Sequence, residues 1–359
     1  MTRPMPLDQF LRLPRVVRGE IVDGLAGAID LVAEATAPSH RFLRHQWYTA
    51  ALRAYGGAAR TLTVSAEDVP VLALPMIAIG PALLRVATVP GSYWPFRSFP
   101  VAADAGVEVL EEALDALAQE VNALRIGPAG DDDQAVSALI AAARARGWGV
   151  AVRTIGQSWL LDMAAKQAEG TWPRNSTLHK NRYHEKRLVE QGALDWRFVS
   201  GHDWPAPFDA LAAIEQASWI ATRTDGQDAK FTDTGHGLFW RAAVADPVLA
   251  GMMRAALLSV DDKPVAFSFD LDAGALKYVI ANSYDPAYAK YSPGKLLYYR
   301  NLIDARSRGT AAVDWGMGDS GYKQAIGAEP GPMLRDWLLL RPGLPARLAP
   351  LINRFWRGR

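Results

Sequence analysis

The first half of the chain alternates between short apolar runs and longer stretches with helical spacing. The runs that predict strands cover residues 16–22, 61–65, 71–79 and 83–89. The stretches that predict helices cover residues 24–35, 46–55, 107–124 and 133–146. A further strand is expected near 125–126, and a hairpin over 149–155 and 158–163. The strands predicted at 61–65, 71–79 and 83–89 have the spacing of a β-meander.

The second half repeats this order of elements without repeating its letters. Strands are predicted at 194–199, 255–260, 265–271, 275–282, 311–315 and 336–340. Helices are predicted at 207–219, 236–245, 294–307 and 320–326. The repeat predicts an α/β fold with two tandem lobes, each a mixed α+β sheet with helices on both sides, and a cleft between them. The expected parts are a lobe at 1–165, a linking basic helix at 166–192, a lobe at 193–342 and a basic amphipathic tail at 343–359.

Composition then narrows the class of protein. A chain of 359 residues suits two domains of about 170 residues each. The net charge of +1 does not favour a nucleic-acid binder, so no nucleic-acid partner is expected. The chain has no cysteine, which excludes disulfides, thiolate metal sites and a cysteine nucleophile, and its six histidines are scattered, so no metal site is expected. Without an apolar leader or an 18-residue apolar stretch, the expected location is cytoplasmic.

The segment from Tyr284 to Tyr298 carries the most chemical information. A strand ends there, and Ser292-Pro293-Gly294 stands where the next helix begins. A helix N-terminus binds phosphate through free N–H groups and the helix dipole, glycine lets an anion approach closely, and a lysine follows. The alternative is a common helix start without a ligand, in which the serine is the N-cap and the proline the first helical residue.

A second segment runs from Val313 to Lys323. Asp314 lies on a predicted strand, and Tyr322 and Lys323 lie on the short helix after it. A carboxylate and a tyrosine hydroxyl can serve as base and acid in the acylation of an amine. The alternative is a structural pair, with the aspartate capping a turn and the tyrosine half-buried. The glycines at 316–321 also mimic a dinucleotide fingerprint and a serine-protease signature, but the surrounding elements fit neither.

These two segments together resemble the CelD/BcsL-type GNAT acyltransferases over residues 170–325, and Lys180 to Gly192 resembles the basic helix that opens that domain. The doubled order of elements resembles the Fem-type peptidoglycan aminoacyltransferases, which carry two GNAT lobes. The resemblance implies an acyl-CoA co-substrate and no metal. The donor-binding residues that it implies are Tyr291, Ser292, Pro293, Gly294, Lys295 and Leu296. The implied catalytic residues are Asp314, Tyr322 and Lys323.

The loop at 90–100 is the first lobe's counterpart of the donor loop, but it has no Ser-Pro-Gly before its helix. We therefore expect the first lobe to contribute shape and acceptor binding. The residues expected to contact the acceptor are Tyr93, Trp94, Arg97, Trp219, Arg223, Phe231, Tyr284 and Asp285. Solvated loops with anchoring aromatic residues are the alternative for these positions.

The expected function is N-acylation of a small-molecule amine in a cell-envelope precursor, either an amino sugar of an exopolysaccharide or a lipid amine. Three alternatives stay open. The acceptor can be a sphingoid base, as in ceramide-type lipid synthesis. The donor can be an aminoacyl-tRNA, as in Fem-type enzymes, although the lack of surplus positive charge disfavours this. The fold can also serve as a non-catalytic ligand-binding domain.

The tail from Leu344 to Trp356 combines large apolar residues with arginines. Such a basic amphipathic segment can lie on an anionic membrane surface, which would give peripheral contact with the inner membrane. It can equally dock as a helix on the preceding lobe.

Overall fold

The computed structural model describes residues 16–91, 97–218, 229–318 and 321–356. The first half contains β1 (Val17–Asp23), α1 (Ala28–Ala35), η2 (Pro38–His40), α2 (His45–Tyr55), β2 (Ala59–Ala66), β3 (Val69–Ile79), η3 (Ala82–Leu84), β4 (Val86–Thr88), α3 (Val107–Glu120), β5 (Ala123–Gly130), α4 (Gln134–Ala145) and β6 (Gly149–Asp162). Most of these elements fall where the apolar pattern predicts them.

The second half begins with α5 (Met163–Ala168), α6 (Asn175–Val189), β7 (Leu194–Ser200), η4 (Gly201–Asp203), α7 (Phe208–Ala217), α9 (His236–Ala243), α10 (Pro247–Met252) and β8 (Met253–Val260). It continues with β9 (Lys263–Ala273), β10 (Leu276–Tyr284), η5 (Pro286–Tyr291), α11 (Pro293–Ser307), β11 (Ala312–Met317), α12 (Tyr322–Ala325), β12 (Glu329–Leu340), α13 (Leu344–Arg347) and α14 (Ala349–Trp356). The predicted repeat of element order is therefore present.

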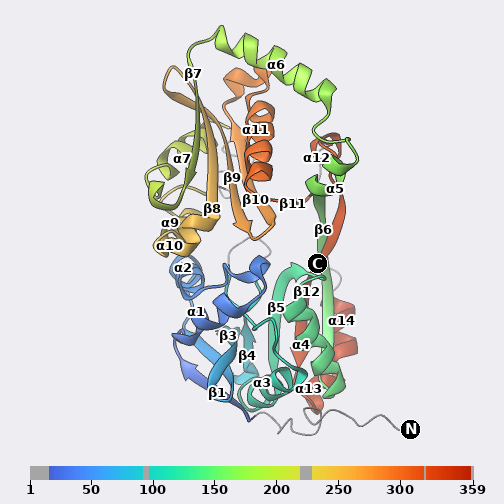
Figure 1. The fold of residues 1–359 in the computed structure, drawn as a ribbon. Helices are drawn as coiled ribbons and strands as arrows, with labels where there is room; N and C mark the ends of the chain where they lie inside the picture. Colours follow the sequence, from blue (N-terminus) through green and yellow to red (C-terminus); the bar gives the residue numbers. More distant parts are fainter. Residues whose placement is uncertain (1–15, 92–96, 219–228, 319–320, 357–359) are drawn as a thin grey trace, which may run out of the picture.

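Within the described residues, the strands form one mixed twelve-stranded sheet in the order β1-β2-β3-β4-β5-β12-β6-β11-β10-β9-β8-β7. Figure 1 shows an elongated molecule in which β1–β5 and their helices form one body, and β7–β11 with theirs form the other. We call these bodies the N-terminal lobe and the C-terminal lobe. The predicted α/β class with two tandem lobes is confirmed.

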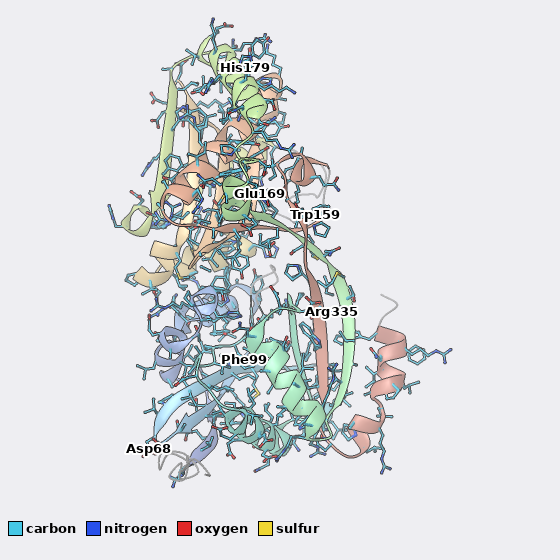
Figure 2. The ribbon with its side chains drawn as sticks, turned by 45° about the vertical axis from the view of Figure 1, so that its right-hand side comes forward. Asp68, Phe99, Trp159, Glu169, His179 and Arg335 are labelled. Carbon is cyan, nitrogen blue, oxygen red and sulfur yellow. The ribbon has the colours of Figure 1, made fainter. Side chains whose placement is uncertain are left out.

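The two lobes exchange their last strands. β12, from the second half, pairs antiparallel with β5 of the N-terminal lobe. β6, from the first half, pairs antiparallel with β11 of the C-terminal lobe over Ser158–Asp162 and with β12 along its length. Trp159 on β6 and Arg335 on β12 mark these two long strands in Figure 2. Because each lobe completes its sheet with the other's strand, the two lobes fold as one sheet.

Side chains from both lobes also share one hydrophobic core. Trp47 on α2 packs edge-on against Phe239 and Trp240 of α9, with ring centroids 4.7 and 6.0 Å apart. Beside them, Arg44 Nε donates to Asp246 Oδ2 across the lobe boundary at 2.9 Å. A fully buried aromatic contact and a largely buried ion pair fix the lobes relative to each other.

Three local predictions were wrong. Residues 149–162 form the single strand β6, not a hairpin, because the chain crosses from one lobe to the other there. The helix predicted to reach 124 ends at Glu120, and Leu124 belongs to β5. The linking segment contains two helices, α5 and α6, rather than one.

The tail docks on the N-terminal lobe. β6 has β11 beside it only over Ser158–Asp162, so its lower part has an open edge opposite β12. Asn353 Oδ1 of α14 accepts a hydrogen bond from Val152 N–H at this edge, at 3.1 Å. A Cβ at Gly149 would lie 2.7 Å from the carbonyl oxygen of Ala346, so glycine permits this close packing. The tail thereby covers an exposed strand edge.

Candidate active site

The parallel strands β10 and β11 part in the middle of the C-terminal lobe. They pair over three positions only, from Leu276 with Ala312 to Tyr278 with Asp314. Immediately afterwards β10 has a bulge between Val279 and Ala281, and in Figure 1 the strands diverge. The edge of β10 from Val279 to Tyr284 faces this opening and has no strand paired to it on that side among the described residues. The opening can admit a substrate that bonds to the free strand edge.

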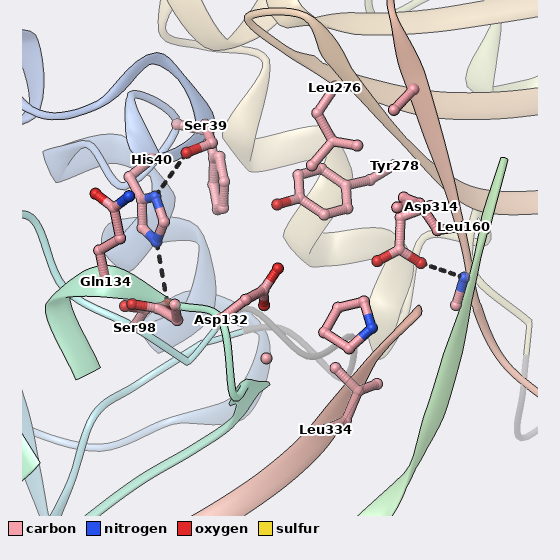
Figure 3. A pocket seen from close by; sticks show the side chains of 16 residues that line it. Ser39, His40, Ser98, Asp132, Gln134, Leu160, Leu276, Tyr278, Asp314 and Leu334 are labelled. Carbon is pink, nitrogen blue, oxygen red and sulfur yellow. Dashed lines mark hydrogen bonds and ion pairs between the residues drawn. The ribbon is translucent and has the colours of Figure 1, made fainter. Parts of the chain in front are cut away.

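A cavity of about 330 Å³ lies where the strands part, and we call it the inter-lobe cavity. Its upper wall comes from β10, β11, β6 and β12, and includes Tyr278 and Asp314. Its lower wall comes from the N-terminal lobe: η2, residue 98, and the turn between β5 and α4. Figure 3 shows side chains from both lobes pointing into it. The cleft predicted between the lobes is therefore present, and residues from both lobes line it.

Asp314 is the titratable group at the parting point. The carboxyl is 9 % exposed, and its Oδ1 accepts a hydrogen bond from Gly316 N–H at 2.7 Å. Burial raises the pKa of Asp314 to about 6, although the Gly316 N–H opposes this shift. A carboxylate with a pKa just below neutral is suited to accept a proton from an attacking nucleophile.

Tyr278 stands beside Asp314 on the neighbouring strand, and Figure 3 shows its phenol directed into the cavity. Burial, followed by the nearby charge of Asp314, raises the pKa of Tyr278 above its usual value. The phenol therefore stays protonated at neutral pH and can donate a hydrogen bond or a proton.

The lower wall carries a histidine–carboxylate pair. His40 Nε2 lies 3.0 Å from Asp133 Oδ2, and Ser39 Oγ lies 3.0 Å from His40 Nδ1. Burial by itself lowers the pKa of His40, but Asp133 outweighs it and leaves the pKa raised. Burial by itself would raise the pKa of Asp133, but bonds from His40 and from Val136 N–H hold it below its usual value. The contact therefore favours the charged forms of both side chains.

Asp132 points into the cavity from the same turn (Figure 3). Desolvation, then the neighbouring Asp133 and Asp131, raise the pKa of its carboxyl. Three carboxyls and one histidine line the inter-lobe cavity, and the histidine is already paired with one of them. The cavity is therefore negative near neutral pH and favours a cationic occupant.

Of the three predicted catalytic residues, only Asp314 lines the inter-lobe cavity. Lys323 is buried, and its Nζ donates to the carbonyls of Trp315, Gly316 and Met317 at 2.6, 2.9 and 2.9 Å. These three hydrogen bonds stabilise the backbone at the end of β11. Tyr322 packs edge-on against Trp315, with ring centroids 6.0 Å apart, in the core beneath α11. Neither side chain lines the inter-lobe cavity, although the positive charge of Lys323 lowers the pKa of Asp314. The assignment of these two residues to proton transfer stays a prediction.

The predicted donor loop lies at the far end of β10. Three of its residues, Tyr291, Pro293 and Leu296, are buried and support the loop. Ser292 is the N-cap of α11 and Pro293 its first residue, as the alternative expects, but Ser292 is left-handed, with φ 54°, and its side chain makes no cap hydrogen bond. The first turn of α11 has no acidic residue, and it includes Lys295. Its leading N–H groups, Gly294 and the lysine thus offer a site that suits a phosphate.

The residues expected to contact the acceptor do not gather in the cavity. Tyr93, Trp94, Trp219 and Arg223 lie outside the described residues. Phe231 was wrongly assigned, because it is fully buried against Phe208, Phe267 and Phe269.

The remaining three predicted acceptor residues do not line the inter-lobe cavity, and two of them, Arg97 and Asp285, have structural bonds. The backbone of Arg97 pairs with β5, since its N–H donates to the Pro128 carbonyl at 3.3 Å and its carbonyl accepts from Gly127 N–H at 3.2 Å. Asp285 caps η5 through Ala287 N–H and pairs with Lys263 at 2.7 Å, and Tyr284 lies beside Gly294, where a Cβ would be 3.0 Å from its ring. Tyr284 and Asp285 therefore belong to the donor end of β10.

Sequence reasoning missed His40, Asp132, Asp133 and Tyr278. The only signal in the sequence was the run of three aspartates before α4, and this reads equally well as a helix start. Only the packing of one lobe on the other shows that these residues share a cavity with Asp314.

Comparison with known proteins agrees with this geometry. A family model described as an acetyltransferase (GNAT) domain matches residues 175–324. Residues 175–324 are therefore similar to a GNAT acetyltransferase domain. No curated protein matches the chain in sequence.

Solved structures match nearly the whole chain. The crystal structure of FemX has 12% identity and a TM-score of 0.60, covering 93% of this chain and 100% of FemX. A conserved protein of unknown function from Bacteroides thetaiotaomicron has 13% identity and a TM-score of 0.56, covering 90% of this chain and 100% of its own. L-PGS from Bacillus licheniformis has 12% identity and a TM-score of 0.52, covering 94% and 98%. At such identities these matches establish the tandem GNAT fold and not a substrate.

Two features are absent from the described residues. No group of His, Asp or Glu side chains there could hold a metal ion. No described helix is long and apolar enough to cross a membrane.

Proposed function

We propose that this tandem GNAT protein is an acyl-CoA-dependent N-acyltransferase of the CelD/BcsL type that acylates an amine of a cell-envelope precursor. One observation carries the proposal. Asp314, a buried carboxyl with a pKa of about 6, lies where β10 and β11 part and faces a cavity that the other lobe closes. Asp314, which can accept a proton, thus lies between the open edge of β10 and the inter-lobe cavity that would hold the amine.

The donor side of this proposal uses the length of β10. From Tyr278 to Tyr284 the strand spans roughly 20 Å, at about 3.3 Å per residue. The phosphopantetheine arm of coenzyme A can bridge such a span. Its pyrophosphate would meet the N–H groups at the start of α11 and Lys295, and its thioester would reach the bulge beside Tyr278.

The chemistry follows from the residues at the parting point. As the amine nitrogen bonds to the thioester carbonyl carbon, Asp314 takes one proton from that nitrogen. The carbon–sulfur bond then breaks, and the sulfur leaves with a proton from the Tyr278 hydroxyl, which the proton on Asp314 replaces. The products are an amide and a free thiol, so atoms and charge balance. Because the chain has no cysteine, the acyl group passes directly from donor to acceptor within a ternary complex.

The cavity's charge supports an acceptor that carries positive charge. Asp132 and the paired Asp133 face the region into which the amine must enter. A protonated amine is attracted there, and it must release one proton to solvent before it attacks, so that the ionised Asp314 can take the second proton. An amino sugar and a lipid amine such as a sphingoid base both meet this requirement. The experiment below distinguishes between these two classes of acceptor.

The proposal is tested by measuring thiol release from acetyl-CoA and from a long-chain acyl-CoA, with glucosamine and sphingosine as acceptors. Wild-type protein and Asp314→Asn are compared in parallel, together with Asp304→Asn as a surface carboxylate control in the same lobe. We expect amine-dependent thiol release that Asp314→Asn loses and Asp304→Asn retains. Glucosamine as the better acceptor supports the polysaccharide form, and sphingosine supports the lipid form.

Binding of the donor is measured separately by thermal shift. A ligand at 100 times its Kd stabilises a protein by about 2.7 kcal/mol. If neither coenzyme A nor either acyl-CoA shifts the transition, the acyl-CoA proposal fails. A shift without any turnover would favour the ligand-binding alternative.

A further inference from the structure

The docked tail turns its most apolar side chains outward. Leu344, Leu351 and Phe355 are 72%, 54% and 71% exposed, and Leu348 is 44% exposed. Their positions are three or four residues apart, so they form one stripe along α13 and α14. Figure 1 shows α14 on the outer side of the N-terminal lobe, and Figure 2 shows side chains of this helix projecting away from the sheet.

The opposite face of the tail is already packed. Ala349 is buried and Ile352 lies against the cluster that Ala123 and Leu340 form. Asn353 bonds to the edge of β6, and Trp356 lies under the guanidinium of Arg153, 5.2 Å from the ring centroid to Cζ. The outward stripe is therefore not needed to hold the tail in place, and its exposure costs solvation free energy with no gain in packing.

Positive charge flanks the stripe. Arg347 and Arg354 are exposed and lie seven positions apart, one beside each half of the stripe. Neither side chain forms an ion pair with a carboxylate among the described residues. No acidic residue occurs anywhere from Gly343 to Arg359. The surface thus combines apolar side chains with uncompensated arginines.

This combination decides between two occupants. A second copy of the chain could cover the leucines, but it would bring the same arginines against Arg347 and Arg354 with no carboxylate between them. An anionic lipid surface accepts the apolar side chains into its outer acyl region and places phosphates beside the arginines. Charge complementarity therefore favours the lipid surface.

We propose that the outward stripe of α13 and α14, namely Leu344, Leu348, Leu351 and Phe355 with Arg347 and Arg354, is a docking surface for anionic lipid bilayers. The tail lies in the plane of the interface, with its inner face still docked on β6. The protein binds reversibly, because one short helix buries few side chains. The proposal does not depend on the acyltransferase reaction.

The test is sedimentation of the full chain with vesicles of phosphatidylcholine, with and without phosphatidylglycerol. We expect binding to the anionic vesicles only, and weaker binding as salt is added, since salt screens the arginines. Replacement of both outward side chains, Leu351→Ser with Phe355→Ser, should weaken binding at least about tenfold. Arg347→Gln with Arg354→Gln should remove the preference for phosphatidylglycerol.

Leu31→Ser is the matched control, because Leu31 is 65% exposed on α1 of the same lobe and lies outside the tail. It should bind vesicles like the wild type, and all variants should keep the wild-type thermal transition. Wild-type protein that stays in the supernatant with anionic vesicles overturns the proposal, as does equal loss of binding in the control. Sedimentation equilibrium that shows a dimer broken by Phe355→Ser would assign the stripe to a second copy instead.

Discussion

The two lobes have the same order of elements, but only one keeps an opening between its central parallel strands. In the C-terminal lobe, β10 and β11 part after Tyr278 and Asp314, and no strand of the described part of the chain pairs with β10 on that side. In the N-terminal lobe, β4 and β5 also pair at three positions, but residues 97–102 fill the space beyond them. Arg97 bonds to β5 through Gly127 N–H and the Pro128 carbonyl, and the carbonyl of Pro100 accepts a bond from Ala73 N–H of β3. The chain itself occupies the place that a substrate would need.

The helices that follow these strands, α11 and α3, also differ in how well their N-termini suit a phosphate. α11 begins with no acidic residue and carries Lys295 in its first turn. α3 carries Glu108 in its first turn, and the carboxylate of this residue lies over Gly106, at the start of the helix. A phosphate would be attracted to the start of α11, whereas Glu108 would repel it from the start of α3.

The chemistry at the parting point differs as well. The last strand pair is Tyr278 with Asp314 in the C-terminal lobe and Thr88 with Arg125 in the N-terminal lobe. Arg125 forms an ion pair with buried Asp336 at 2.8 Å, so it holds β12 in place. The N-terminal lobe therefore forms one wall of the inter-lobe cavity. It supplies His40, Asp132 and Asp133 to the cavity, and its described residues leave no open edge of β5 beyond β4.

The largest effect is expected from Asp314→Asn. Removal of a general base typically lowers turnover by about 10²-fold or more, and the affinity for coenzyme A should not change because the donor loop is remote. In the wild type, turnover should rise as the pH increases through about 6, where Asp314 loses its proton. Rapid single-turnover measurements across this pH range check both points. A variant that keeps wild-type turnover would show that Asp314 is structural.

The same substitution should stabilise the protein. Burial raises the pKa of Asp314 from 3.8 to about 6, so the folded state binds this proton more tightly than the unfolded state does. The stability contribution is full below pH 3.8 and is lost as the pH rises through about 6, at a cost of up to about 3 kcal/mol. Asparagine carries no charge, so Asp314→Asn should unfold at higher denaturant concentration than the wild type at pH 8. The difference should vanish near pH 4, and an equal difference at both pH values would contradict the cause.

A smaller effect is expected from Asp132→Asn. The loss of one cavity carboxylate should raise KM for a cationic amine by several-fold, about 1 kcal/mol, and leave kcat nearly unchanged. Asp131→Asn is the control, because Asp131 carries the same charge one residue away and does not line the cavity. Steady-state kinetics with one amine and varied salt check this prediction. Equal effects of the two substitutions would mean that only the overall charge matters.

The sequence predicted the repeat well because strands and helices leave local patterns. It placed α11 within one residue of its observed start, and it singled out Asp314. It could not predict the exchange of β6 and β12, because strand order in a sheet depends on pairings between residues far apart in the chain. For the same reason it missed His40 and Asp133, which join Asp314 only through the packing of the lobes. It did not single out Tyr278, because this residue meets Asp314 only through the pairing of β10 with β11.

The central claim is that donor binding belongs to the C-terminal lobe alone. Titration calorimetry with coenzyme A tests it most directly, with Gly294→Val as the variant, Gly251→Val as a helix glycine control with free space around it, and Gly106→Val as the counterpart in the N-terminal lobe. The account predicts one site per chain in the wild type and in both comparison variants, and affinity at least about tenfold weaker in Gly294→Val, whose side chain obstructs the approach of the pyrophosphate. Two sites per chain, or full affinity in folded Gly294→Val with a loss in Gly106→Val, would contradict it.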